Sequence, residues 1–279
     1  MAGSALDRAF TVLELLASHP AGLPLHQIAT AADMPKSAAH RLLGALAARR
    51  YARQDAETGR YLLTTRLVSL GFRYLALAGV VDTVQPTLDR LAQEAGELVR
   101  LSVIDGDRQT WVAKAQGARA GLKYDPDMGM EAPLASTASG HAWLACLTDD
   151  EAIELVARQG FRPPESEGPN APRTFEALLT RIKAARRRGY ATVVESSAPG
   201  TAAMATAVRH PLTGGVVGVL SVAGPSVRLT ESRMQALAPQ MLAAAGELSD
   251  ACKSSEYFTA ASRSTGRPGA RPLEMHDAL

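Results

Sequence analysis

The sequence has few of the features that mark membrane, secreted or disulfide-bonded proteins. Its 279 residues include only two cysteines, Cys146 and Cys252, which stand far apart without a C-x-x-C pair. Neither a disulfide framework nor a metal site is therefore expected. The longest uncharged apolar stretches, Leu75 to Val81 and Val216 to Val222, are shorter than the roughly 18 residues that a membrane span needs. Since Met1 to Ser4 also lack the apolar core of a signal peptide, we expect a soluble cytoplasmic protein.

Motifs of the common enzyme classes are missing as well. The chain contains no G-x-S-x-G, P-loop, H-E-x-x-H or complete dinucleotide fingerprint, and Gly214 to Gly218 are explained by a turn that enters a strand. One alternative is an esterase-like enzyme in which His141 activates Ser139, but no third residue completes a triad. We expect no enzymatic activity and no cofactor.

Charge is distributed unevenly along the chain. Residues 1–78 contain nine Lys or Arg against five Asp or Glu, a net charge of +4, whereas the remainder carries −2. A basic N-terminal part joined to a mildly acidic larger part suggests a module that binds a polyanion, attached to a sensing or assembly module.

Apolar spacing predicts a series of helices and a hairpin in residues 1–78. The first helix is indicated by an apolar face at helical spacing, formed by Leu6, Phe10, Leu13 and Leu16. A short helix from Leu25 to Ala32 and a third helix after Pro35 follow, the latter with an inward face formed by Ala39, Leu42, Leu43 and Leu46. From Tyr51 to Leu63 the period becomes two around a glycine-containing turn, which is typical of a hairpin. Thr64 can cap a fourth helix, with an inner face formed by Leu67, Leu70 and Leu75.

This order of elements is that of a winged helix-turn-helix, whose third helix fits the major groove of DNA. The outer face of that helix offers small polar and cationic side chains, namely Lys36, Ser37, His40 and Arg41. The tip of the hairpin can reach the flanking DNA backbone or the minor groove through Arg53, Thr58 and Arg60. The same topology also occurs in modules that dock proteins, so a protein-docking function stays as the alternative.

The sequence resembles the IclR family of transcription regulators. In the first 78 residues the resemblance lies in Ser4 to Phe10, Met34 to Leu43 and Thr58 to Leu63. Beyond them it continues, in the order and spacing of the family, through Gly96-Glu97, Pro133 to Ala142, Arg188 to Ala191, Ala198 to Gly200 and Leu220 to Pro225. The resemblance covers about residues 4–252, and the combination is far more specific than any single motif.

The second part of the chain mixes strands and helices. Asp82-Thr83 can cap a helix that ends at Gly96, and Leu98 to Ile104 and Gln109 to Ala115 are strands around a tight turn. Further helices and strands predict an α+β domain with an antiparallel sheet, to which the IclR resemblance adds a GAF-like fold. We expect a winged helix-turn-helix domain at 1–78, a linker helix at 79–97, a GAF-like effector-binding domain at 98–252 and a disordered tail at 253–279.

A small-molecule site is expected in the second domain. Ser136 to Gly140 lie at a loop-to-helix junction, where hydroxyls and free backbone N–H groups favour a carboxylate, although the segment could simply cap the helix. The resemblance implies effector contacts from this segment and from two strands, carried over here to Ala138, Ser139, Thr201, Ala203, Ser221 and Ala223. Departures from the family are His141, where many members carry lysine, and the apolar Ala203 and Ala223.

Larger side chains are available for the wall of such a pocket. Tyr124, Met128, Met130 and Trp143 would suit an aromatic or longer-chain acid, but for each of them the favoured interpretation is a plain core residue. Glu195 is either a ligand partner or a surface acid. The complete set of candidate effector residues is Ser136, Thr137, Ala138, Ser139, Gly140, His141, Tyr124, Met130, Glu195, Thr201, Ala203, Ser221 and Ala223.

Together these features predict a DNA-binding transcription regulator that responds to a small organic acid. The expected partners are double-stranded operator DNA and the acid, with RNA polymerase as a further candidate. One domain of this size reads few base pairs, so we expect a homodimer or a dimer of dimers on a palindromic site.

Overall fold

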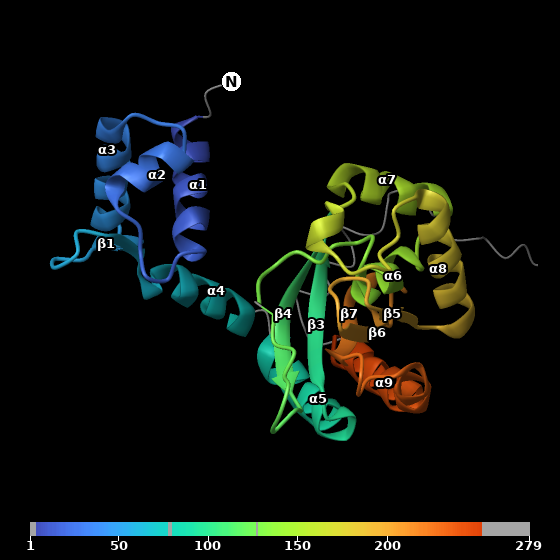
Figure 1. Ribbon diagram of the computed structural model, residues 1–279. Coiled ribbons are helices and arrows are strands. Elements are labelled where there is room, and N and C mark those ends of the chain that lie inside the picture. The colour runs from blue at the N-terminus through green and yellow to red at the C-terminus, as the bar shows by residue number, and fades with distance from the viewer. Residues whose placement is uncertain (1–3, 78–79, 127, 253–279) are drawn as a thin grey trace, which may run out of the picture. The chain divides into compact units, whose positions relative to one another are not determined.

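The computed structural model describes residues 4–77, 80–126 and 128–252, with the backbone alone at 75–77 and 80–83. The chain divides into two compact units, residues 1–77 and 78–279 (Figure 1). Each unit is described by itself. The predicted disordered tail at 253–279 lies outside the described residues.

Four helices and a hairpin form the described part of the first unit. α1 (Ala5–Ala17) begins at a capping box in which Ser4 and Asp7 exchange hydrogen bonds, and α2 (Leu25–Ala31) and α3 (Lys36–Ala48) follow. β1 (Ala52–Gln54) and β2 (Tyr61–Leu63) pair antiparallel. The centre of the core is formed by Val12, Leu16, Ile28, Ala39 and Leu43. This arrangement confirms the predicted helix-turn-helix.

The predicted inner faces of the first and fourth helices are only partly right. Leu16 is buried, but Leu6 is 64% and Phe10 54% exposed, because α1 turns Val12 and Leu16 toward α2 and α3 instead. In α4 (Thr65–Leu77), Leu67 and Leu70 are exposed too, since this helix follows the hairpin and does not cover the core. The structure does not describe the side chain of Leu75.

The second unit is built on a five-stranded antiparallel sheet in the order β4-β3-β7-β6-β5. Its strands are β3 (Leu98–Asp105), β4 (Arg108–Gln116), β5 (Ala191–Val194), β6 (Thr201–Arg209) and β7 (Val216–Pro225). The central strands β3 and β7 are buried on both faces, which is why they read as nearly continuous apolar runs. The predicted antiparallel sheet is confirmed.

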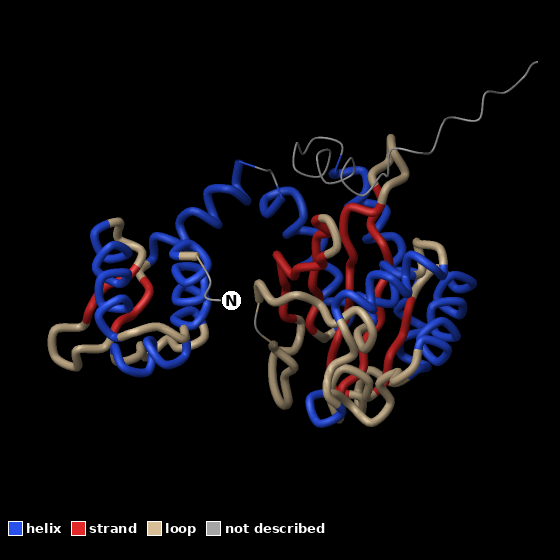
Figure 2. Tube along the Cα trace, turned by 90° about the horizontal axis from the view of Figure 1, so that it is seen from above, coloured by secondary structure: helices blue, strands red, loops and turns tan. Residues whose placement is uncertain are grey.

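Helices cover both faces of this sheet (Figure 1), and Figure 2 shows the strands side by side between them. α5 (Val80–Ala95) and α9 (Glu231–Ala251) pack against each other and against one face. On the other face lie α6 (Ala138–Leu144), α7 (Asp149–Gln159) and α8 (Phe175–Arg188). A short 3₁₀ turn, η1 (Pro164–Ser166), connects α7 to α8.

Most helix ends of this unit have the caps and stops that their local sequence favours. Thr148 and Glu151 form the capping box of α7, Thr230 caps α9, and Gly189 ends α8 in the left-handed conformation that favours glycine. The predicted cap at Asp82-Thr83 is wrong, because α5 already begins at Val80. Neither glycine nor proline stands between Val80 and Thr83 to break the helix.

Candidate effector pocket and nucleic-acid interface

A pocket of about 460 Å³ lies over the sheet face that α6 covers. Side chains at alternate positions of a strand point to the same face, and so Arg100 of β3, Ser221 and Ala223 of β7, and Thr201 and Ala203 of β6 meet on its floor. Its walls come from β4, from the following loop, from the start of α6, from the loops after α7 and β5, and from Ala202 of β6. They are formed by Trp111, Tyr124, Asp125, Pro126, Met130, Glu131, Pro133, Thr137, Ala138, Ser139, Arg162, Ser197 and Ala202.

The structure brings nine of the thirteen predicted effector residues into this lining. They are Tyr124, Met130, Thr137, Ala138, Ser139, Thr201, Ala203, Ser221 and Ala223. Four predicted residues lie outside it: Ser136, Gly140, His141 and Glu195. The polar and apolar wall residues therefore converge from segments that are far apart in the sequence.

The segment at the start of α6 is a capped helix terminus. The Thr137 hydroxyl accepts the Gly140 N–H at 2.9 Å and donates to the Pro133 carbonyl oxygen at 2.8 Å. A Cβ added at Gly140 would lie 2.3 Å from the Leu134 carbonyl oxygen, so only glycine allows this close approach. Ser139 is buried and lines the pocket.

His141 lies behind the pocket wall, which removes the basis of the esterase hypothesis. Its Nε2 is 2.6 Å from the Ala135 carbonyl oxygen, so this nitrogen carries the hydrogen of the neutral ring. Complete burial lowers the pKa of His141 to about 4, with Arg181 adding to the effect and the hydrogen bond to Ala135 opposing it. A neutral histidine held to the backbone in this way is a core residue.

Glu195 has a structural contact as well. It has a positive φ of 49° at the end of β5, and its carboxylate accepts the Gly200 N–H at 3.2 Å, closing the turn into β6. This places Glu195 in the support of the β5–β6 turn and not among the pocket residues.

The sequence-based prediction missed Arg100, the most unusual group in the pocket. Arg100 is only 4% exposed, and its Nε and Nη1 have no hydrogen-bond partner. Its guanidinium lies 3.9 Å from the centre of the Trp111 ring and 5.9 Å from that of Tyr124, within the range of cation–π attraction. A lone arginine inside an otherwise apolar strand run was the signal that could have identified it.

The two acidic residues of the wall already have cationic partners. Asp125 accepts a hydrogen bond from Lys114 at 2.6 Å, and Glu131 pairs with Arg108. Both pairs join β4 to the loop that follows it, and they fasten the wall that carries Tyr124 and Met130.

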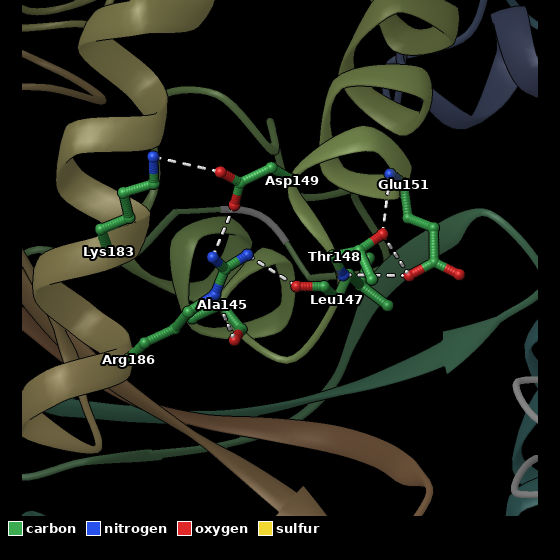
Figure 3. A network of polar contacts seen from close by, with 7 residues as sticks. All are labelled: Ala145, Leu147, Thr148, Asp149, Glu151, Lys183 and Arg186. Atoms are coloured by element: carbon green, nitrogen blue, oxygen red, sulfur yellow. Dashed lines mark hydrogen bonds and ion pairs between the residues drawn. The ribbon is translucent and has the colours of Figure 1, made fainter.

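An arginine on α8 fixes the far end of α6 (Figure 3). Arg186 donates from Nε to the Ala145 carbonyl oxygen at 3.1 Å and from Nη2 to that of Leu147 at 2.6 Å. Its Nη1 is 2.5 Å from one Asp149 carboxylate oxygen, and Lys183 is 3.2 Å from the other. Hydrogen bonds from Arg186 and then Lys183 hold the pKa of Asp149 below its ordinary value. The helix that presents Ala138 and Ser139 to the pocket is thus anchored to α8.

The candidate nucleic-acid interface lies on α3 of the first unit. No side chain of the described residues caps α3, which starts after Pro35, so its first N–H groups are available to an anion. Lys36, Ser37, His40 and Arg41 are all exposed on one side of the helix. The opposite side is buried, and the structure therefore brings the four predicted side chains together on one exposed surface.

The hairpin tip is shaped by its own polar contacts. The Asp55 carboxylate accepts the N–H and hydroxyl of Thr58 at 2.9 and 2.8 Å, and these bonds lower the pKa of Asp55. Arg53 is exposed and 3.6 Å from Asp55. Arg60 donates to the Gly22 carbonyl oxygen at 3.1 Å, so this residue stabilises the unit whether or not it also meets DNA.

A shallow cleft extends this basic surface beyond the predicted residues. It lies between the end of α3, β1 and the start of α4, and it is lined by three arginines, Arg50, Arg53 and Arg66. Arg50 and Arg66 were not among the predicted contacts, because they fall at element boundaries where no spacing rule assigns them to a face.

Within residues 4–77, 80–126 and 128–252, no helix has the length and apolarity to cross a membrane. The same residues contain no group of three or more His, Cys, Asp or Glu side chains placed to hold a metal ion. Both cysteines are free, and burial raises the pKa of Cys252 to about 12, in keeping with a packing role.

Two family models match the sequence. Residues 72–250 match the family described as bacterial transcriptional regulator IclR C-terminal, and residues 5–56 match the IclR helix-turn-helix domain.

Curated and solved relatives agree with these matches. The HTH-type transcriptional regulator BhcR of Paracoccus denitrificans is 29% identical over 245 residues, which are 88% of this chain and 86% of the relative. The structure of an IclR transcriptional regulator from Alicyclobacillus acidocaldarius has a TM-score of 0.76 at 23% identity, covering 88% of this chain and 98% of its own. An IclR homolog from Microbacterium hydrocarbonoxydans, solved in complex with 4-hydroxybenzoate, has a TM-score of 0.74 at 21% identity, covering 90% of this chain and 100% of its own.

Proposed function

Because the chain belongs to the IclR family of bacterial transcriptional regulators, we propose that its DNA binding is controlled by a small organic acid held in the pocket of the second unit. The chain is a DNA-binding transcriptional regulator, and regulators of this family are not enzymes. The rival hypotheses of a protein-docking winged domain and an esterase are therefore set aside.

The first unit would read the operator through α3. Lys36, Ser37, His40 and Arg41 stand together on the exposed side of the helix, and the adjacent arginine-lined cleft would hold backbone phosphate. Base contacts would then supply specificity and phosphate contacts most of the salt-dependent affinity. Arg53 is a better candidate than Arg60 for a phosphate contact, since Arg60 already donates to Gly22.

The main observation in favour of control by a small organic acid is the pocket itself. Its volume of about 460 Å³ falls in the range of roughly 300 to 1,000 Å³ that is common for small-molecule sites, and its lining combines apolar side chains with a few aimed polar groups. The relative solved with 4-hydroxybenzoate supports a hydroxylated or unsubstituted aromatic acid as the first class to test. The two aromatic rings at the pocket wall, Trp111 and Tyr124, also suit a flat ligand.

Self-association through the first unit is the third part of the proposal. Leu6 and Phe10 of α1 and Phe72 of α4 are exposed, and large exposed apolar side chains in one small unit favour an interface. A symmetric dimer would present two α3 helices to the two halves of a palindromic operator. A role for RNA polymerase as a partner stays a prediction.

The test is fluorescence anisotropy of the full-length protein on the DNA upstream of its own gene, titrated against salt and against an unrelated fragment of equal length. Selective binding whose affinity falls steeply with salt is expected. Adding the effector must then shift the binding midpoint, because a ligand with equal affinity for both DNA-binding states would shift nothing. If no organic acid changes the DNA affinity, the proposal that a small organic acid controls DNA binding is contradicted.

A further inference from the structure

A buried guanidinium without hydrogen-bond partners is costly to the folded protein. Arg100 is close to this description, since it is 4% exposed and two of its three guanidinium nitrogens, Nε and Nη1, are unpartnered. Burial lowers the pKa of Arg100 from its ordinary value, although Tyr124 and Asp125 offset part of the effect. Arginine nevertheless keeps its charge, so the pocket of the ligand-free protein contains a cation that its surroundings compensate only in part.

The pocket's own acidic residues do not satisfy this cation. Asp125 is 2.6 Å from Lys114, and Glu131 is paired with Arg108. Among the described residues no carboxylate lies in ion-pair contact with Arg100. The Trp111 ring, 3.9 Å from the guanidinium carbon, stabilises the cation but accepts no hydrogen bond along the plane of the guanidinium. The unpartnered Nε and Nη1 donors of Arg100 could therefore be satisfied by an anion bound in the pocket.

The start of α6 offers the anion fewer and weaker hydrogen-bond donors than Arg100 does. The helix has seven residues, and its Gly140 N–H already donates to the Thr137 hydroxyl. The hydroxyls of Ser139, Thr201 and Ser221 are neutral donors, and that of Ser221 already donates to the Arg100 carbonyl oxygen at 3.3 Å. A charge-assisted bond to arginine is about twice as strong as a neutral one.

We propose that Arg100 binds the carboxylate of the effector, so that the pocket selects organic acids with a flat apolar body over their neutral analogues. This inference rests on the proposed function, because it assigns a residue and a ligand class to the same pocket. The carboxylate would lie against the guanidinium on the strand floor, beside Trp111 and Tyr124. The body of the ligand would lie over the small side chains of Ala203 and Ala223.

The experiment compares the full-length wild type with Arg100→Gln and Arg100→Lys by isothermal titration calorimetry. The probes are benzoate, 4-hydroxybenzoate, phenylacetate and succinate, with benzamide and phenylacetamide as neutral matches. Arg187→Gln is the matched control, because Arg187 is an exposed arginine of α8 outside the pocket lining. We expect at least one acid to bind the wild type and its amide to bind at least tenfold more weakly.

Removing the Arg100 guanidinium should lower the affinity for that acid by about 30-fold or more, because a buried charged partner is lost. Arg100→Lys should retain part of the affinity, and Arg187→Gln should change it by less than about threefold. Equal affinity of the wild type and Arg100→Gln for the acid, or of the acid and its amide for the wild type, would overturn the assignment of Arg100. Failure of every acid to bind the wild type would instead overturn the proposed function.

A second readout separates ligand binding from a structural role. Because Arg100 has unpartnered donors in the ligand-free protein, Arg100→Gln should melt at the same temperature as the wild type or higher when no ligand is present. The saturating acid should raise the melting temperature of the wild type but not of the variant. A ligand-free variant that melts well below the wild type, with its acid affinity unchanged, would show that Arg100 only supports the fold.

Discussion

In the first unit the candidate functional side chains stand on the outside of one helix, whereas in the second unit they converge on a pocket from several strands and loops. Lys36 to Arg41 span little more than one turn of α3. On the pocket floor, by contrast, Ser221 donates to the carbonyl oxygen of Arg100, 121 positions earlier in the chain. The first kind of site depends on local spacing, and the second depends on strand pairing across the whole domain.

The comparison predicts that the two functions can be broken separately. Changes at the exposed helix should impair DNA binding without affecting stability, and changes behind the pocket should impair stability and effector response without touching the DNA-binding surface.

The largest effect on stability is expected at Gly140 in the second unit. In Gly140→Ala the new Cβ would meet the Leu134 carbonyl oxygen at 2.3 Å, so the free energy of unfolding should fall by about 2 to 3 kcal/mol. The matched control is Gly246→Ala in α9, where a Cβ meets nothing within 4 Å and stability should rise by up to about 1 kcal/mol. Urea titrations of both variants measure the difference. Equal stability of the two would contradict the close packing of α6 against Leu134.

The pH dependence of stability should carry the signature of His141. Its pKa is about 4 in the folded protein against 6.5 ordinarily, so between these values the unfolded chain binds the proton and the native state does not. Stability is therefore fully present above pH 6.5 and is lost as the pH falls toward 4, by up to about 3 kcal/mol.

His141→Gln keeps an amide nitrogen that can donate to the Ala135 carbonyl oxygen but does not titrate. Unfolding free energies measured at intervals from pH 7 to 4 should decline less steeply in this variant than in the wild type. Parallel curves would mean that His141 titrates normally and is not buried as a neutral ring.

On the DNA side, Arg41→Ala should cost roughly 1 to 3 kcal/mol of operator affinity and relax the base preference, if Arg41 reads a base. Arg53→Ala is the contrasting variant, since loss of a phosphate contact should weaken all sequences alike and lower the salt slope by about one. Anisotropy on operator and unrelated DNA separates the two patterns, and both variants should melt like the wild type. If both variants bind operator DNA as the wild type does, Arg41 and Arg53 are not DNA-contacting residues.

The smallest effect is expected at Arg186. Arg186→Gln removes the hydrogen bonds to the Ala145 and Leu147 carbonyl oxygens, which should cost about 1 to 2 kcal/mol of stability. Since the network holds the far end of α6, effector affinity should fall slightly as well, whereas operator affinity without effector should not change. A variant with lost DNA binding and intact stability would contradict the separation of the two sites.

The parts of the structure that were predictable from sequence are those set by neighbouring residues. The capping box of Thr148 and Glu151, the stop at Gly189 and the tight turn after Asp105 each follow from local chemistry, and each is observed. The exposed face of α3 was predictable for the same reason, because spacing along one helix decides which side chains share a side.

The failures have a common physical cause, which is that burial depends on distant partners. Leu6 and Phe10 have helical spacing but are exposed, because the other helices cover a different stripe of α1. His141 looked like a pocket residue from its position beside Ser139, yet its ring is bonded to Ala135 behind the wall. Arg100 stands out as a lone arginine in an apolar strand run, but the pairing of β3 with β7 is needed to show that it faces a pocket.

The central claim is that an organic acid in the pocket of the second unit controls the DNA binding of the first. Its most direct test measures the anisotropy midpoint on the upstream DNA with and without a saturating acid, for the wild type and for Ser139→Trp, whose indole would fill the pocket. We predict that the acid shifts the midpoint at least fivefold for the wild type and leaves it unchanged for the filled-pocket variant, which still binds DNA. An equal shift in both proteins would place the effector elsewhere and contradict the claim.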